Sequence, residues 1–323
     1  GATVPGLARE LERIGRFGIF GQVLGRRPDA ALLRRVLVEE RSGEHLGVPW
    51  RGTIAWCEGA DVLSTAGLRG AAIGGAALHE GYWIDLDVLR GELRAWERLR
   101  QRFEDPSFAR RLEGLLAVRG FRVEGGGDAE GLSKDERIRK RRREISALLG
   151  ESERVRLAVL SERAAPGQLL GRVSFDELVE VTAIHEEGHL CDRTRFLPLR
   201  RHLVGVLGML AAGGFSPNGV QRLLEYRAQL VAICEAPEPR LPLSDILRAA
   251  EGGGAGGLPH ADAYTDLLND FVEELDRELA ETEASYPQLL RDHTLVHQLH
   301  LLGAEEVRAL AMRLAERRGM VGE

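Results

Sequence analysis

Apolar and charged residues alternate at helical spacing near the start of this chain. Residues 7–41 keep that spacing, with breaks at residues 15–25 and at Pro28. A repeat of three to four residues between apolar positions is typical of an amphipathic helix, and Gly and Pro interrupt it. The pattern therefore predicts two helices in this segment.

Residues 51–87 have a different pattern, with short apolar runs rich in Gly, Ala, Thr and Val: TIAWC, DVLST, GAAIGGAAL and YWIDL. Such runs, separated by turn residues, predict strands. Residues 79–81 (HisGluGly) lie between the last two runs, so residues 70–86 are predicted to form a hairpin. This is the part of the chain where the sequence favours a sheet.

Helix-start signals mark the second half of the chain. Ser174 is followed three residues later by Glu177, which is the capping-box pattern. This helix is expected to end before Pro198, and Ser216-Pro217 is expected to begin another. The other predicted helices are 86–101, 107–118, one starting at Ser133 after a flexible loop (123–131), 198–212, a short one between the Pro-rich stretch at 236–242 and the Gly-rich stretch at 251–259, and two or three near the C terminus.

The predicted fold class is therefore α+β and predominantly α-helical, with one small sheet. We divide the chain into an N-terminal helical segment (1–45), a sheet or hairpin region with helices (46–123), a helical core (132–300) and a C-terminal helix (301–323). The second region is expected to form one unit with the third. No internal repeat is visible.

The composition is that of a globular protein, with 44% hydrophobic residues and a net charge of −6. All basic residues except Lys134 and Lys140 are arginine. The three cysteines form no CxxC pair, which favours a reducing compartment and a cytoplasmic location. Export stays open, because the chain begins with Gly1.

Two segments raise the question of a membrane or nucleic-acid partner. Residues 203–215 are the most apolar run, but they are too short to span a bilayer and suit a buried helix. Residues 137–144 (RIRKRRRE) lack aromatics and have acidic flanks, so a solvated helix face is favoured over a site for nucleic acid or an acidic partner. We expect no membrane span and no nucleic-acid partner.

The segment TAIHEEGHLCD (182–192) carries the strongest chemical signal. His185 and His189 are one helical turn apart, a rise of about 6 Å, so both imidazoles project from one face. Two nitrogens at that spacing can reach one Zn²⁺ at about 2.0–2.1 Å. Glu186 lies at the edge of that face, where it can act as general base toward a metal-bound water. Gly188 lets another element approach closely. The plainer alternative is a helix with two solvated histidines.

This segment resembles the active-site helix of the zincin metallopeptidases. Thr182 matches the position three residues before the first histidine, and uncharged residues flank both histidines. Glu187 departs from the pattern, which suggests a wetter face there. The metzincin branch does not fit, because Arg195 stands where its third histidine belongs and no Gly occupies position 192. The resemblance implies a zincin-like catalytic domain that binds one Zn²⁺.

The third ligand is expected from another helix, as in the gluzincins, where a later helix supplies a glutamate. Glu225 has that place and lies in an apolar run, and Gln229 holds the position of the polar residue that bonds a ligand histidine. Arg222 or Arg227 is the alternative partner of Glu225. Glu235 is the alternative ligand.

Asp192 has two possible roles. It lies too far along the helix to share the metal, so it either orients an imidazole or pairs with Arg193 or Arg195. For substrate binding, residues 70–86 offer an edge strand, with a purely structural hairpin as the alternative. The donor that stabilises the transition state stays open among Tyr226, Tyr264, Tyr286, His260 and His293. His297 and His300 are expected on an ordinary amphipathic helix.

Together these features predict a zinc-dependent metallopeptidase of gluzincin type that acts on a peptide or protein. His185, His189 and Glu225 are the expected ligands and Glu186 the catalytic base. The alternative is a non-catalytic helical interaction or scaffold protein with a vestigial or structural metal site. Substrate preference and oligomeric state stay open.

Overall fold

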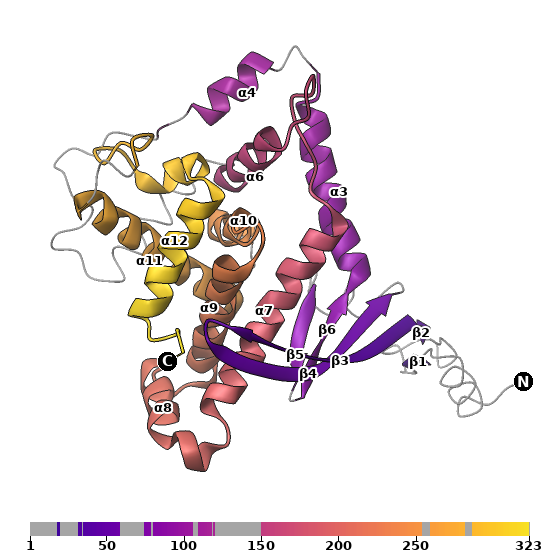
Figure 1. Cartoon of the computed structure of the whole chain (residues 1–323), viewed down its shortest axis with the longest axis vertical. Helices are drawn as coiled ribbons and strands as arrows, with labels where there is room; N and C mark the ends of the chain where they lie inside the picture. Colours follow the sequence, from indigo (N-terminus) through magenta and orange to yellow (C-terminus); the bar gives the residue numbers. More distant parts are fainter. Residues whose placement is uncertain are drawn as a thin grey trace, which may run out of the picture.

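The protein is mostly helical with a small mixed four-stranded sheet, so the α+β prediction is confirmed (Figure 1). The structure, a computed structural model, describes residues 18–19, 32–33, 35–58, 74–78, 80–105, 109–117, 119, 150–253, 259–281 and 286–322. Several predicted features lie outside these residues: the DVLST strand, the 123–131 loop, the helix at Ser133, the arginine run 137–144 and most of residues 7–34.

The main sheet has the strand order β3-β4-β6-β5. Strands β3 (Arg35–His45) and β4 (Val48–Glu58) are antiparallel, β4 and β6 (Gly81–Asp85) are parallel, and β5 (Gly75–Leu78) pairs antiparallel with β6. The hairpin predicted at 70–86 is confirmed as β5 and β6. Two short strands, β1 (Gly18–Ile19) and β2 (Leu32–Leu33), form a separate pair.

The two helices predicted within residues 7–41 are wrong where the structure describes this segment, because residues 18–19, 32–33 and 35–41 lie in strands β1, β2 and β3 (Arg35–His45). Strand β3 pairs with β4 along its whole length through a two-residue turn, where Leu46 and Gly47 have φ of 51° and 72°. A tight turn with positive φ at both residues matches the twist of the two strands. Pairing with a partner strand overrode the local pattern.

The described helices occur close to predicted places, apart from the helix at Glu151–Glu162, which the sequence did not predict. They are α3 (Leu86–Arg102), α4 (Ala109–Leu116), α6 (Glu151–Glu162), α7 (Phe175–Phe196), α8 (Leu199–Ala212), α9 (Pro217–Glu235), α10 (Arg240–Arg248), α11 (Pro259–Glu281) and α12 (Ala304–Arg317), with a π-helical turn η2 (Ala249–Gly253) and a 3₁₀ helix η4 (Leu295–Leu301). His297 and His300 lie on η4 and are buried, so the expected amphipathic α-helix is wrong there.

Helix α7 lies between the sheet and helix α9, and this position organises the fold. Its start is confirmed as a capping box, in which Ser174 accepts from the Glu177 N–H and Glu177 accepts from the Ser174 N–H. One side of α7 packs through Leu190 on the sheet, and the other side packs through Ile184 in the larger helical core. Side chains of α7 therefore face two different partners.

Helix α8 departs from expectation. The sequence predicts a buried helix at residues 203–215, but Leu203, Val204, Leu207 and Phe215 are exposed.

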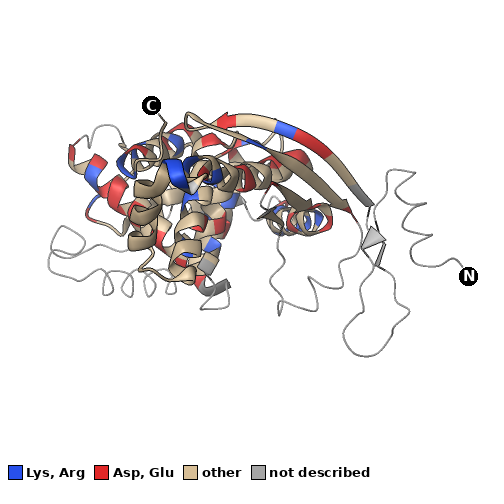
Figure 2. Cartoon of the chain, turned by 90° about the horizontal axis from the view of Figure 1, so that it is seen from below, with Lys and Arg blue, Asp and Glu red and all other residues tan. Residues whose placement is uncertain are grey.

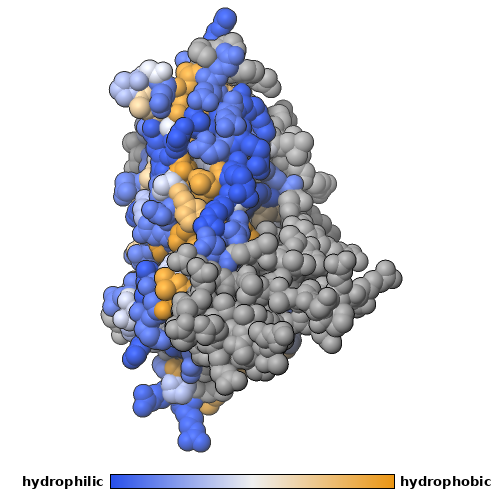
Figure 3. Space-filling model, turned by 90° about the vertical axis from the view of Figure 1, so that its right-hand side faces the viewer, coloured by the Kyte–Doolittle hydropathy of each residue, from blue (hydrophilic) through white to orange (hydrophobic). Residues whose placement is uncertain are grey.

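No single helix among the described residues is long and apolar enough to cross a membrane. Residues 200–212 and 217–235 reach that length and hydropathy only when they are taken as a pair, and this pair is strongly bent. Charges of both signs are spread over the helices (Figure 2), and on the face in Figure 3 hydrophobic patches are interrupted by hydrophilic side chains.

Candidate metal centre

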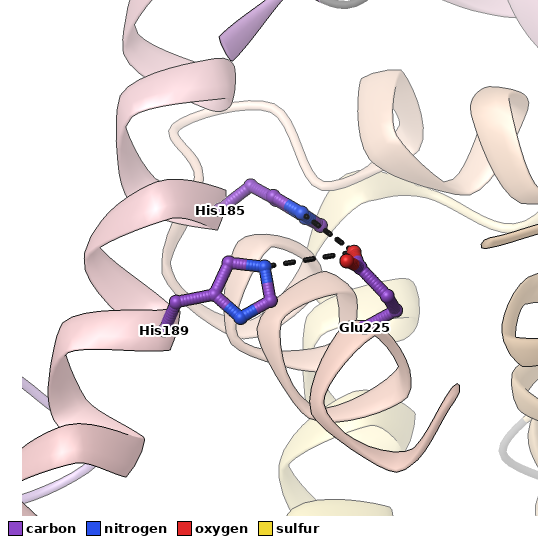
Figure 4. Close-up of side chains that lie close together, drawn as sticks. All are labelled: His185, His189 and Glu225. Carbon is purple, nitrogen blue, oxygen red and sulfur yellow. Dashed lines mark ion pairs between the residues drawn. The ribbon is translucent and has the colours of Figure 1, made fainter. Parts of the chain in front are cut away.

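His185 and His189 project from the middle of α7 toward α9 (Figure 4). Their ring centroids are 5.1 Å apart and the rings are nearly perpendicular. Both side chains are largely buried, with 12% and 15% of their surface exposed. The helical spacing therefore places the two imidazoles on one face, as the sequence predicts, and not in open solvent.

Glu225 comes from α9 and points at both histidines (Figure 4). Its Oε2 atom lies 3.5 Å from Nε2 of His185 and 3.5 Å from Nε2 of His189. Burial favours the neutral acid, but the contacts with His185, His189 and His260 outweigh it, so the pKa of Glu225 is far below its usual range. The carboxylate is therefore ionised and available as a ligand.

The donor set fits a zinc ion. Tetrahedral ligands with bonds of about 2.0–2.1 Å lie about 3.4 Å from one another, and the two imidazole nitrogens lie 3.5 Å from the Glu225 oxygen. All three candidate ligand atoms are within 4.8 Å of each other. Among the described residues, no donor reaches this buried Oε2 in good hydrogen-bond geometry. Two neutral imidazoles and one carboxylate are an ordinary ligand set for catalytic zinc.

Gly188 explains how α9 comes close enough. A Cβ atom built on Gly188 lies 3.0 Å from Cα of Ala228 and 3.3 Å from Cβ of Val231. Contacts that short leave no room for a side chain. The glycine between the two histidines therefore lets the helix that carries Glu225 pack directly against α7, as expected from the sequence.

Gln229 holds one imidazole in a fixed orientation. Its amide nitrogen donates to the carbonyl of Pro242 at 3.0 Å, so its Oε1 faces Nδ1 of His185 at 2.9 Å. Because an amide oxygen can only accept, Nδ1 of His185 is the protonated nitrogen and Nε2 keeps its lone pair. That lone pair faces Glu225. The structure thus places Gln229 where the sequence predicts it.

The arginines proposed as alternative partners of Glu225 lie elsewhere. Arg227 bonds both carboxylate oxygens of Asp192 at 2.8 and 2.9 Å, and Arg222 pairs with Asp266. Both oxygens of the buried Asp192 therefore accept from the one Nε–H of Arg227 on α9, a partner that the sequence did not predict. The alternative ligand Glu235 accepts from the backbone N–H of Leu46, away from the two histidines.

Glu186 is buried beside the cluster. Burial, and then the negative charge of Glu225, raise the pKa of Glu186 to about 7, while His185 and the Ala77 N–H act in the opposite direction. A carboxylate with a pKa near neutrality can both accept and release a proton at working pH. Its Oε2 has no hydrogen-bond partner among the described residues.

Glu187, the residue that departs from the zincin pattern, is not in a wetter environment. It is buried, accepts from the Tyr82 hydroxyl at 2.7 Å, and its other oxygen lies 2.7 Å from Nε2 of His45. These partners come from strands β6 and β3. Sequence reasoning missed both, because they are 105 and 142 residues away and carry no local signal.

His260 and Tyr264 are the two of the five candidate donors that lie on the side of the cluster formed by α11. Nδ1 of His260, near the start of α11, lies 2.9 Å from Oε2 of Glu225, and Tyr264 lies one turn further, with its ring 6.3 Å from that of His260. The other three lie elsewhere: Tyr226 donates to Asp270, Tyr286 contacts Arg313, and His293 contacts Asp292. His260 is about half exposed, so it borders both the cluster and solvent.

Strand β5 borders the site at the edge of the sheet. It pairs with β6 on one side, and on the other side the Ala77 N–H donates to Glu186. A Cβ atom built on Gly75 lies 2.8 Å from Oε1 of Glu186. The small residues of β5 therefore allow the strand to lie directly against the helix that carries the histidines.

The chain was compared with known protein families, curated proteins and solved structures. No protein-family profile, no curated protein and no solved structure matches the chain. The function is therefore argued from the geometry of the site.

Proposed function

We propose that this protein is a zinc-dependent peptidase of the zincin type, with the third ligand supplied as in gluzincins. One observation carries the proposal: His185, His189 and Glu225 converge from two helices, with the buried carboxyl of Glu186 beside them. When bound, zinc supplies Lewis acidity that polarises a peptide carbonyl and makes water more acidic. The three ligands hold the ion, and Gln229 keeps His185 in the ligating orientation.

Glu186 moves the proton in this proposal. Its carboxylate takes a proton from water as the water oxygen adds to the carbonyl carbon of the scissile bond. It then delivers that proton to the amide nitrogen as the C–N bond breaks, so one water is consumed and a carboxylic acid and an amine are formed. A pKa of about 7 suits both steps.

Two further elements suit a peptide substrate. Strand β5 is an edge strand, and an extended peptide can add to it through backbone hydrogen bonds. This favours a substrate-binding role over a purely structural hairpin, because β5 touches Glu186 directly. His260 supplies an N–H that can stabilise negative charge on the carbonyl oxygen, and its 47% exposure leaves it accessible to substrate.

The test combines metal content with cleavage. Purified protein is analysed for zinc, as isolated and after chelation, and is assayed on a broad peptide library. We expect one zinc per chain and cleavage that is lost on chelation and restored by zinc. Zinc binding without any cleavage favours the alternative of a non-catalytic protein with a structural or vestigial metal site.

The variant Glu186→Gln tests the role of Glu186 as general base separately from the role of the three metal ligands. This variant is expected to keep zinc and fold but to lose cleavage by at least about 100-fold. Glu180→Gln is the matched control, because Glu180 is exposed on the same helix. Glu225→Ala is expected to lower zinc occupancy. Full activity of Glu186→Gln, or unchanged stoichiometry in Glu225→Ala, contradicts the respective assignment.

A further inference from the structure

Helix α8 presents an apolar surface to solvent. Leu203, Val204 and Leu207 lie on one face of the helix, and Phe215 follows at the turn into α9. Their exposed fractions are 57%, 85%, 50% and 74%. We name these four residues the α8 patch. Single exposed apolar residues are common, but three on one face of a helix, with a fourth just beyond its end, indicate an interaction site.

The α8 patch lies at an extremity of the molecule. In Figure 1, α8 and α4 lie at opposite ends of the longest axis, and α8 connects the two ligand-bearing helices α7 and α9. Of the residues at the middle of α8, Val206 faces the protein and is buried. Helix α8 can therefore reach a flat surface without any rearrangement of the core.

A basic hollow of about 650 Å³ adjoins the α8 patch and is lined partly by the same helix. Its charged or titratable lining residues are Arg195, Arg200, Arg201, His202 and Arg227. Leu203 and Val204 also line it, so the hollow and the patch share a border. No acidic residue belongs to this described lining.

The positive charge of the hollow is only partly compensated. Arg227 is paired with Asp192, whereas Arg195 donates to the carbonyls of Gly319 and Met320, which leaves its charge in place. Arg200 and Arg201 are exposed and form no ion pair within the described part of the chain. Burial, and then the charge of Arg227, lower the pKa of Arg195, as expected in a positive field.

The sequence around α8 also has an excess of positive charge. Residues 193–224 contain five arginines and no Asp or Glu, in a chain with a net charge of −6. An apolar helical face beside exposed arginines is typical of helices that lie in the plane of an anionic membrane surface. With 14 residues, α8 is far too short to cross a bilayer, so it would lie on it.

We propose that α8 docks on an anionic lipid membrane, with the α8 patch among the acyl chains and a lipid phosphate group in the basic hollow. This inference does not depend on the proposed peptidase activity. A second copy of this chain is a poorer partner, because a symmetric contact through α8 brings Arg200 and Arg201 toward their own copies. A nucleic acid would satisfy the arginines but not the exposed leucine and valine side chains.

The test is flotation of the full chain with vesicles of phosphatidylcholine alone or with phosphatidylglycerol. We expect binding to the anionic vesicles at least roughly tenfold stronger than to the neutral ones, and weaker binding at high salt. No binding to anionic vesicles, or equal binding to both kinds, overturns the proposal.

Variants locate the contact. Val204→Asp is expected to abolish vesicle binding, and the double variant Arg200→Glu/Arg201→Glu to reduce it roughly tenfold or more. Val38→Asp is the matched control, because Val38 is also exposed but lies on β3. Circular dichroism checks that each variant is folded. The proposal fails if Val204→Asp binds like Val38→Asp, or if its main effect is to convert a dimer into a monomer.

Discussion

Nδ1 of His185 lies 2.9 Å from Oε1 of Gln229, and the amide nitrogen of Gln229 is held by the Pro242 carbonyl. This chain of two hydrogen bonds fixes which nitrogen of His185 carries the proton. The Pro242 carbonyl, near the start of α10, therefore determines that Nε2 of His185 presents its lone pair to Glu225.

Replacing Gln229 is expected to weaken metal binding without removing a ligand. Gln229→Leu removes the acceptor for His185 Nδ1–H, so the imidazole loses its preferred tautomer and orientation. Loss of such a partner costs about 10- to 100-fold in zinc affinity. Competition with a chromophoric chelator measures this, with Gln221→Leu, exposed on the same helix, as control. Equal affinities of the two variants would show that Gln229 does not orient the ligand.

The close approach of α7 and α9 at Gly188 predicts a second outcome. Gly188→Val forces the helices apart, because even a Cβ atom lies 3.0 Å from Cα of Ala228. We expect a loss of about 1–3 kcal/mol in the free energy of unfolding and lower zinc occupancy. Denaturant unfolding and metal analysis measure the two effects.

Gly208→Ala is the control for Gly188→Val. A Cβ atom at Gly208 on α8 meets nothing within 4 Å, and alanine favours a helix over glycine by about 1 kcal/mol. This variant is expected to keep zinc binding and to be equally or more stable. A Gly188→Val protein with unchanged stability and zinc content would mean that the two helices do not pack as described.

Tyr82 and Glu187 predict a stability effect outside the metal cluster. Tyr82→Phe leaves Oε1 of the buried Glu187 without its hydroxyl partner. A buried acceptor without a partner costs about 1–3 kcal/mol. Chemical denaturation of Tyr82→Phe, Glu187→Gln and the double variant forms a cycle that isolates this contact. If the effects of the single variants simply add, the hydrogen bond contributes nothing.

His300 predicts a pH dependence of stability. Burial lowers the pKa of His300 from 6.5 to about 4, and the nearby charges of Arg154 and Arg119 act in the same direction. The unfolded chain therefore binds a proton between about pH 6.5 and 4 that the folded chain does not. Stability is complete above pH 6.5 and falls as the pH drops through this window, by up to about 3 kcal/mol.

Comparison with His300→Gln isolates this contribution. Nε2 of His300 contacts the Leu116 carbonyl, and a glutamine amide can donate to the same oxygen without titrating. The free energy of unfolding is measured from pH 7.5 to 4 for both proteins. Their difference should shift in favour of the variant as the pH falls, and parallel curves would rule out His300 as the cause.

Local signals in the sequence were enough for much of the helical framework. The capping pattern at Ser174 and the Ser-Pro start at residues 216–217 predicted where α7 and α9 begin. The spacing of His185 and His189 placed both imidazoles on one face. These features depend on hydrogen bonds and side-chain directions within one or two turns, so the nearby residues suffice to determine them.

Contacts between distant segments decided the features that local signals did not predict. Arg35–His45 became a strand because β4 offers a full-length partner, and Glu187 is buried because Tyr82 and His45 reach it from the sheet. The exposure of α8 and the position of His260 beside Glu225 also depend on how helices pack. The sequence shows which side chains are apolar and which are charged. Only the packed structure decides which surface or partner meets it, because burial and pairing are properties of segments brought together in space.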